Sequence, residues 1–176
     1  FEFVRGNNVT LALQSTQVVP FIDKLGDELS TALNHVKVEL VREHEGAQDV
    51  IFQIDRDRIM RVIENLVNNS RDALVNAEVP EAKVWLQTKV VNNQIKVRIA
   101  DNGPGIPEEL SKKLFKPFAT AGKANGTGLG LTIVKNLITA HDGEVQVDFE
   151  PAEGGAAFEL TLPLQSSELD QQTSVA

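Results

Sequence analysis

Residues 55–77, DRDRIMRVIENLVNNSRDALVNA, decide the architecture because they carry the clearest helical pattern in the chain. Apolar side chains recur there at spacings of three and four from Ile59 to Leu74, which predicts a helix with one buried face. Asp55 or Asp57 can cap its first turn, because a carboxylate accepts hydrogen bonds from free backbone N–H groups. Pro80 ends the pattern. The stretch therefore predicts one long amphipathic helix.

The sequence on either side alternates between strand and helix patterns. Asn92-Asn93 separates two β-rich segments and is typical of a hairpin turn, and Gly143 is the expected stop of the last helix. The predicted elements are helices over 18–33, 107–114 and 127–140, and strands over 35–44, 50–54, 83–90, 94–100, 144–149 and 156–162. This order indicates an α/β two-layer sandwich, a mixed sheet with helices packed on one face.

Composition excludes several functional classes. The 176 residues carry 25 acidic and 17 basic side chains, a net charge of -8, which argues against nucleic-acid binding through clustered Lys and Arg. The absence of cysteine excludes disulfides and Cys-ligated metals. No apolar run approaches the ~20 residues that cross a bilayer. Because the chain starts at Phe1 without a signal peptide, we expect a cytoplasmic piece of a longer protein.

A polar ridge runs along the helix predicted at 55–77. Asn65, Asn69 and Asp72 lie at i, i+4 and i+7, opposite the apolar face. Asparagine is a modest helix former, so three asparagines within residues 65–69 cost stability. An amide oxygen can complete an Mg²⁺ shell whose other ligands are phosphate and water. The ridge therefore indicates either a metal-binding face or an ordinary solvated one.

The segment 101–107, DNGPGIP, directly follows a predicted strand. Gly103 and Gly105 would let the backbone approach a flat ligand closely. The carboxylate of Asp101 beside them could accept a hydrogen bond from an exocyclic amine, such as that of adenine. The alternative is an ordinary Gly/Pro turn.

The segment 114–118, LFKPF, places two aromatic residues around a turn. Packing is their simplest role. We therefore expect Phe118 to position the loop that follows rather than to react.

The segment 126–131, GTGLGL, opens the helix predicted at 127–140. Backbone N–H groups at a helix N-terminus form an anion site. The spacing matches neither the Rossmann fingerprint nor the Walker A loop. Lys123, three residues earlier, either contributes a charge for phosphate or is a surface lysine.

In this order, the four motifs resemble the N, G1, F and G2 boxes of the ATP-binding domain of sensor histidine kinases, within the gyrase/Hsp90/histidine kinase/MutL superfamily. The match covers about residues 55–164, and residues 16–54 fit the family's opening helix and strand pair. The stretches NNSRDAL, DNGPGIP, LFKPFAT and GTGLGLTIVKNLITAHDG are especially similar to the nitrogen-regulation-like kinases. The resemblance implies a Bergerat-type ATP-binding fold with ATP and Mg²⁺ as cofactors.

The resemblance also implies individual roles. Asn69 matches the Mg²⁺-binding asparagine, Asn65 is the polar residue one turn earlier, and both are candidate catalytic residues. Asp101 matches the adenine-reading aspartate, and residues 119–125 match a short mobile lid over ATP. Ser70 replaces the usual alanine, and Asp72 stands where many relatives carry lysine. The implied nucleotide-binding positions are Asn69, Asp72, Asp101, Gly103, Gly105, Ile106, Phe118, Lys123, Gly126, Thr127, Gly128, Leu129, Gly130 and Leu131.

The implied reaction is transfer of the γ-phosphoryl group to a histidine on an adjacent dimerisation domain, for relay to a cognate response regulator. Related hydrolases place a glutamate at the position of Asn65, and an amide cannot act as a general base, so transfer is favoured over hydrolysis. We expect none of His35, His44 and His141 to be the acceptor, because they flank a predicted strand or end a helix. The fragment is expected to be monomeric and the full-length protein a homodimer.

The chain accordingly divides into an exit from an upstream dimerisation domain (1–15), the ATP-binding domain (16–164) and a polar tail expected to be disordered (165–176). An anti-sigma-type serine kinase is an alternative, disfavoured by the non-Met start and by residues 3–6, which resemble an exit from dimerisation helices. A nucleotide-binding or partner-binding module without transfer is another. Asn69, Asp101 and the intact glycines weigh against it.

Overall fold

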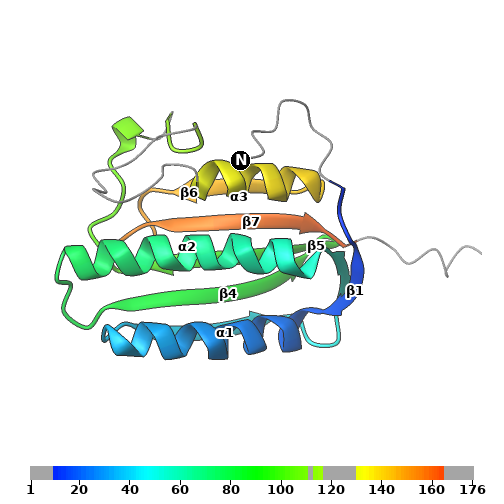
Figure 1. The fold of residues 1–176 in the computed structure, drawn as a ribbon, viewed down its shortest axis with the longest axis horizontal. Helices are drawn as coiled ribbons and strands as arrows, with labels where there is room; N and C mark the ends of the chain where they lie inside the picture. Colours follow the sequence, from blue (N-terminus) through cyan, green and yellow to red (C-terminus); the bar gives the residue numbers. More distant parts are fainter. Residues whose placement is uncertain (1–9, 111–112, 117–129, 165–176) are drawn as a thin grey trace, which may run out of the picture.

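Three helices lie across one face of a five-stranded sheet in the computed structural model, which describes residues 10–110, 113–116 and 130–164 (Figure 1). The helices are α1 (Val18–His35), α2 (Arg56–Asn76) and α3 (Gly130–Ala140), with a 3₁₀ turn at Glu108–Leu110. The strands are β1 (Gln14–Gln17), β2 (Glu39–Glu45), β3 (Ile51–Ile54), β4 (Lys83–Val91), β5 (Gln94–Asp101), β6 (Glu144–Asp148) and β7 (Ala157–Pro163). The predicted two-layer α/β sandwich is confirmed.

The sheet is mixed, with the strand order β2-β4-β5-β7-β6. In the sheet as described, β2 and β4 are parallel, and the other three pairs of neighbouring strands are antiparallel. The strand predicted at 50–54 forms β3, which pairs outside this sheet with β1. No strand is predicted at β1, which begins at Gln14, two residues before the expected start of the ATP-binding domain.

Each α-helix of the described ranges is followed, two residues after its last residue, by a non-glycine residue in the left-handed conformation. Lys37, Glu78 and Asp142 have φ values of 58°, 51° and 57°. After each of them, a backbone N–H returns to the last helical turn, which satisfies carbonyls that would otherwise lack partners. The strand predicted from 35 therefore begins only at Glu39, because the turn through Lys37 first closes α1.

Gly143 follows α3 as expected, but for a different reason. Asp142 supplies the left-handed conformation, and Gly143 donates its N–H to the Ile138 carbonyl at 2.9 Å. A Cβ atom at position 143 would lie 2.5 Å from the Thr161 carbonyl oxygen. Glycine is therefore required by the close approach of β7 rather than by a positive φ.

The hydrophobic core lies between the helices and the sheet. Residues of the stripe predicted on α2 are buried, except Ala73, which is half-buried. Buried residues of α1, α3 and the sheet complete the core: Ile22, Leu25, Leu29, Leu33, Val84, Leu86, Val97, Ile99, Val134, Ile138 and Leu160. Among the described helices, none has the length and apolar character to cross a membrane.

The start of α2 is tied to the end of α3. The Asp55 backbone N–H donates to His141 Nε2 at 3.1 Å, and His141 Nδ1 lies 2.7 Å from the Leu137 carbonyl oxygen. Since Nε2 accepts a hydrogen bond, Nδ1 carries the proton and donates to that carbonyl. The end of α3 therefore lies beside the start of α2, and Gly130 at the start of α3 lies beside Asn65 in the middle of α2, so the two helices are antiparallel.

Asp55 caps α2 and is held by several donors. Its Oδ1 accepts from the Arg58 N–H at 3.2 Å, and its Oδ2 accepts from the Ala12 N–H at 3.0 Å and from Arg58 Nε at 3.2 Å. Burial acts to raise the pKa of Asp55, but these hydrogen bonds and the charge of Arg58 outweigh it, and the pKa is lowered. The ionised carboxylate is therefore the form that stabilises the fold.

Asp55→Ala is expected to lower the free energy of unfolding at pH 7 by about 1–2 kcal/mol through loss of the cap. Because the folded-state pKa lies below the unfolded value of about 3.9, the contribution of the charge is complete above that value and is lost as the pH falls through the folded-state pKa. Urea unfolding of the parent, Asp55→Ala and the neutral capping variant Asp55→Asn measures this. A parent–Asn difference as large at pH 2.5 as at pH 7 would contradict it.

Candidate functional site

The polar ridge of α2 faces the N-terminal end of α3. Asn65 Nδ2 donates to the Arg61 carbonyl at 2.9 Å, which leaves the amide oxygen directed outward from the helix. A Cβ atom at Gly130 would lie 3.4 Å from that oxygen. Asn69 and Asp72 follow on the same ridge and are half-buried. Tertiary folding therefore brings together the first and the fourth sequence motifs.

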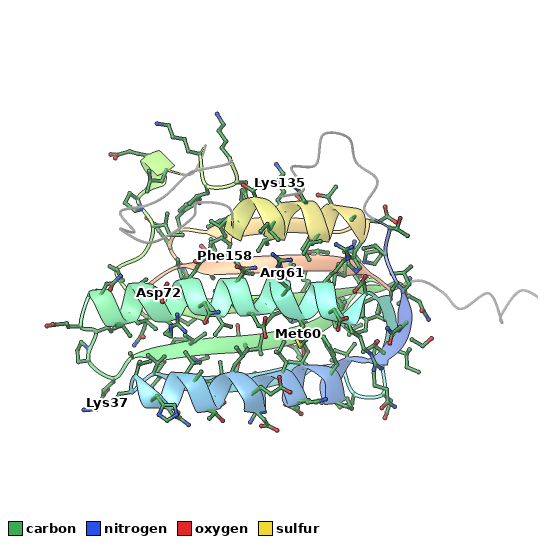
Figure 2. All side chains as sticks on the ribbon, viewed as in Figure 1. Lys37, Met60, Arg61, Asp72, Lys135 and Phe158 are labelled. Atoms are coloured by element: carbon green, nitrogen blue, oxygen red, sulfur yellow. The ribbon has the colours of Figure 1, made fainter. Side chains whose placement is uncertain are left out.

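The C-terminal part of this ridge carries a charge pair. Arg71 Nη2 lies 2.8 Å and Arg71 Nε 3.1 Å from Asp72 Oδ1, and both side chains are about one-third exposed. Figure 2 places Asp72 towards the end of α2 that leads into β4. The guanidinium group thus balances an acidic side chain at this position.

Asp101 is the buried carboxylate of the site, with 5% of its surface exposed. Its Oδ1 accepts hydrogen bonds from the Gly103 N–H at 2.9 Å and from the Ala156 N–H at 3.3 Å. Oδ2 has no hydrogen bond to any residue within the described ranges. The carboxylate is therefore oriented through one oxygen and retains the other as an acceptor.

Glycines surround this carboxylate. A Cβ atom at Gly103 would lie 2.9 Å from Asp101 Oδ1 and 3.4 Å from Leu74 Cδ2 of α2. Gly105 has φ 78°, which favours glycine, and a Cβ atom there would lie 3.1 Å from the Gly155 carbonyl oxygen. The loop therefore runs close to α2 and to the turn before β7.

Gly155 is a site residue that sequence reasoning missed. A Cβ atom there would lie 2.2 Å from Asp101 Oδ1 and 2.4 Å from the Asp101 carbonyl oxygen. The Gly155 N–H also donates to that carbonyl at 3.0 Å. The only signal in the sequence is the pair Gly154-Gly155 before a β pattern, and nothing in it points to Asp101.

The remaining predicted residues are only partly described. Ile106 and Leu131 are half-buried and pack against the core. Leu114 is buried and Phe115 packs on the core, so the packing role expected for the aromatic residues of this segment is confirmed for Phe115. The segment is held to α3, because Thr132 donates to the Phe115 carbonyl at 3.2 Å. Phe118, Lys123, Gly126, Thr127, Gly128, Leu129 and the lid at 119–125 lie outside the described residues.

A metal at this site would depend on amide oxygens. Across the described ranges, no group of three or more His, Cys, Asp or Glu side chains could hold a metal ion. Asn65 and Asn69 instead present neutral oxygen donors one helical turn apart. This donor set fits Mg²⁺, which commonly keeps water and ligand phosphates in its shell.

Two cavities lie away from this cluster. One of 470 Å³ is bounded by α1, α2 and β1, with Phe21, Arg56 and Met60 among its lining residues. One of 230 Å³ is lined by residues of β2, β4, β5 and β7, including Gln87 and Arg98. Residues 117–129, which include most of the fourth motif, lie outside the described residues. We therefore locate the site from its polar groups rather than from cavity size.

Known proteins resemble this chain in sequence and in fold. Residues 54–166 match the family described as "Histidine kinase-, DNA gyrase B-, and HSP90-like ATPase". The sensory histidine kinase/phosphatase NtrB of Vibrio alginolyticus is 36% identical over 121 residues, which cover 63% of this chain and 33% of that protein. The signal transduction histidine-protein kinase AtoS of Escherichia coli K12 is 36% identical over 137 residues, which cover 77% of this chain and 21% of that protein.

A solved structure supports the same assignment. The catalytic domain of histidine kinase ThkA superposes with a TM-score of 0.74 at 26% identity, and the match covers 88% of this chain and 97% of that domain. This chain spans a third or less of the two curated relatives described above. The chain therefore belongs to the family of histidine kinase-, DNA gyrase B- and HSP90-like ATPases, and its fold is that of a histidine kinase catalytic domain.

Proposed function

We propose that this chain binds Mg²⁺-ATP between α2, the end of β5 and the start of α3, and transfers the γ-phosphoryl group to a histidine on an adjacent dimerisation domain, for relay to a response regulator. The observation that carries the proposal is the Asp101 carboxylate, buried, oriented through Oδ1 and next to a glycine-lined loop. The amide ridge of α2 lies on the same side of the sheet, beside Gly130.

The carboxylate of Asp101 suits the exocyclic amine of adenine. Oδ2 remains as an acceptor, and an amine donates to it, whereas the carbonyl oxygen of guanine at the same position would repel it. Gly103 and Gly105 let the loop beside the proposed base site pack closely against Asp101, Leu74 and Gly155. Asn69 would hold Mg²⁺, whose charge offsets that of the phosphates, and Asn65 lies one turn earlier beside Gly130.

Asp101→Asn is expected to weaken ATP binding by about 1–3 kcal/mol, the usual cost of unpairing a buried polar group. The preference of the parent for ATP over GTP should decrease with it. Calorimetric titration of both nucleotides into parent and variant measures the change. Equal affinity of the parent for ATP and GTP would contradict base recognition by Asp101.

Transfer rather than hydrolysis is supported by the chemistry of Asn65. Its amide already donates to the helix backbone and cannot take a proton from water. The surroundings of the three histidines also support an acceptor histidine on another domain. His141 uses both ring nitrogens between α2 and α3, and His44 contacts Thr88 Oγ1 at 2.6 Å and Asp23 Oδ1 at 3.1 Å. His35 is exposed at the end of α1.

Incubation of this chain with γ-labelled ATP tests the proposed division of labour. The chain should bind ATP but not label itself, because transfer requires an acceptor nitrogen in line with the leaving oxygen. Adding the upstream helical domain of the same kinase as a separate chain should restore labelling, on a histidine of that domain. Acid-labile, base-stable label on the chain itself would contradict the proposal, and acid-stable label would indicate a hydroxyl acceptor.

A further inference from the structure

The sheet face opposite the helices carries a two-pronged ion pair between β5 and the turn after β6. Arg98 Nη1 lies 2.7 Å from Glu153 Oε1, and Arg98 Nη2 lies 2.9 Å from Glu153 Oε2. The two side chains are only 22% and 14% exposed. Paired charged hydrogen bonds of this kind fix geometry as well as contributing energy.

Other groups around the guanidinium strengthen this arrangement. Gln87 Oε1 accepts from Arg98 Nη1 at 2.9 Å, and Asp148 Oδ2 lies 3.7 Å from Nη2. The hydrogen bonds from Arg98 hold the pKa of Glu153 below its usual value, and those to Glu153 raise the pKa of Arg98. The pair is therefore charged at neutral pH.

The turn that carries Glu153 also donates hydrogen bonds to Asp101. Two residues after Glu153, the Gly155 N–H donates to the Asp101 carbonyl at 3.0 Å, and the Ala156 N–H donates to Asp101 Oδ1 at 3.3 Å. Arg98 and Asp101 are three residues apart on β5, so their side chains leave opposite faces of the strand. The turn 151–156 therefore contacts side chains on both faces of β5: Arg98 on one face and the Asp101 carboxylate on the other.

We propose that Arg98 is a positioning residue for base recognition: through Glu153 it holds the turn 151–156 at the place where Ala156 orients the Asp101 carboxylate. The proposal rests on the adenine-reading role proposed above for Asp101. Neither Arg98 nor Glu153 touches the nucleotide. Without the ion pair, the turn can shift, the hydrogen bond to Oδ1 weakens, and Oδ2 is no longer held in one direction towards the amine.

Two nucleotides distinguish positioning from a general effect on the fold: ATP, and its analogue with hydrogen in place of the 6-amino group. Glu153→Ala is expected to lower ATP affinity about three- to tenfold, the range for one lost hydrogen bond, and to leave the affinity for the analogue unchanged. A residue that only stabilised the fold would lower the unfolding midpoint but would not move the ratio of the two affinities.

Arg98→Lys is the second variant, because lysine keeps the charge but cannot form the two-pronged contact. It should also lower the ratio of ATP affinity to analogue affinity. If Glu153→Ala fails to fold, Arg98→Lys alone tests the positioning role. Glu45→Ala is the matched control. It removes another ion pair, Lys89 Nζ to Glu45 Oε1 at 2.9 Å, at the β2–β4 edge, and should leave the ratio as in the parent.

The positioning role would be overturned if the folded Glu153 and Arg98 variants kept the parent's ratio of ATP affinity to analogue affinity, whether both affinities stayed the same or fell equally. A parent that does not distinguish ATP from the analogue would overturn base recognition by Asp101, and this proposal with it. Preference for ATP in the parent, reduced in both variants and retained in Glu45→Ala, is the expected result.

Discussion

Asn69→Ala is expected to reduce phosphoryl transfer to the histidine-bearing domain by about 10²–10³-fold, the range seen when one group that stabilises transition-state charge is removed. The amide oxygen of Asn69 is the proposed Mg²⁺ ligand, and alanine offers none. The fold should persist, because Asn69 is half-buried on the ridge opposite the apolar stripe of α2. Transfer rates and Mg²⁺-dependent ATP binding measure the loss.

Asn68→Ala is the matched control for this prediction. It makes the same substitution in the same helix, but its side chain leaves α2 about 100° away from that of Asn69. Transfer by Asn68→Ala should stay within a few-fold of the parent. If Asn69→Ala binds Mg²⁺-ATP as tightly as the parent, the metal assignment is wrong.

Gly155→Ala is expected to remove most ATP binding, with a loss of about 2–4 kcal/mol that combines overpacking with misplacement of the buried carboxylate. The added methyl group would lie 2.2 Å from Asp101 Oδ1 and 2.5 Å from the Gly103 nitrogen. Neither neighbour can retreat easily, because both belong to the loop that carries the site. Calorimetric titration with ATP, together with urea unfolding, separates lost binding from lost stability.

Gly154→Ala provides the comparison for this prediction. Its added methyl group meets no atom within 4 Å, so the variant bears only the backbone strain of φ 98°. It should lose about 1 kcal/mol of stability and keep most of its ATP affinity. Equal ATP affinity of Gly155→Ala and the parent would show that the close packing around Asp101 does not matter for binding.

Local patterns in the sequence were sufficient for the choice of fold and for most elements, but not for β1 or for the stretch predicted as a helix at 107–114, where the structure has a 3₁₀ turn at Glu108–Leu110. The helix at 56–76, its Asp55 cap and the Asn92-Asn93 hairpin depend on residues within a few positions of one another. Asn92 and Asn93 have φ values of 51° and 58°, as such a turn requires. The ridge of Asn65, Asn69 and Asp72 followed from helical periodicity alone. The sequence-based predictions were least accurate after helix ends, where Lys37 and Asp142 adopt a left-handed conformation that glycine usually adopts.

Pairing between distant segments was decided only by the tertiary structure. The contacts of Asp101 with Ala156 and of Arg98 with Glu153 each join residues 55 positions apart, and no local propensity encodes them. The sequence by itself determined which polar residues share one ridge of α2, because helical periodicity is a local property. The tertiary structure decided that Gly155 must lack a side chain and which turn holds the carboxylate, because close packing depends on what other parts of the chain bring to the same place.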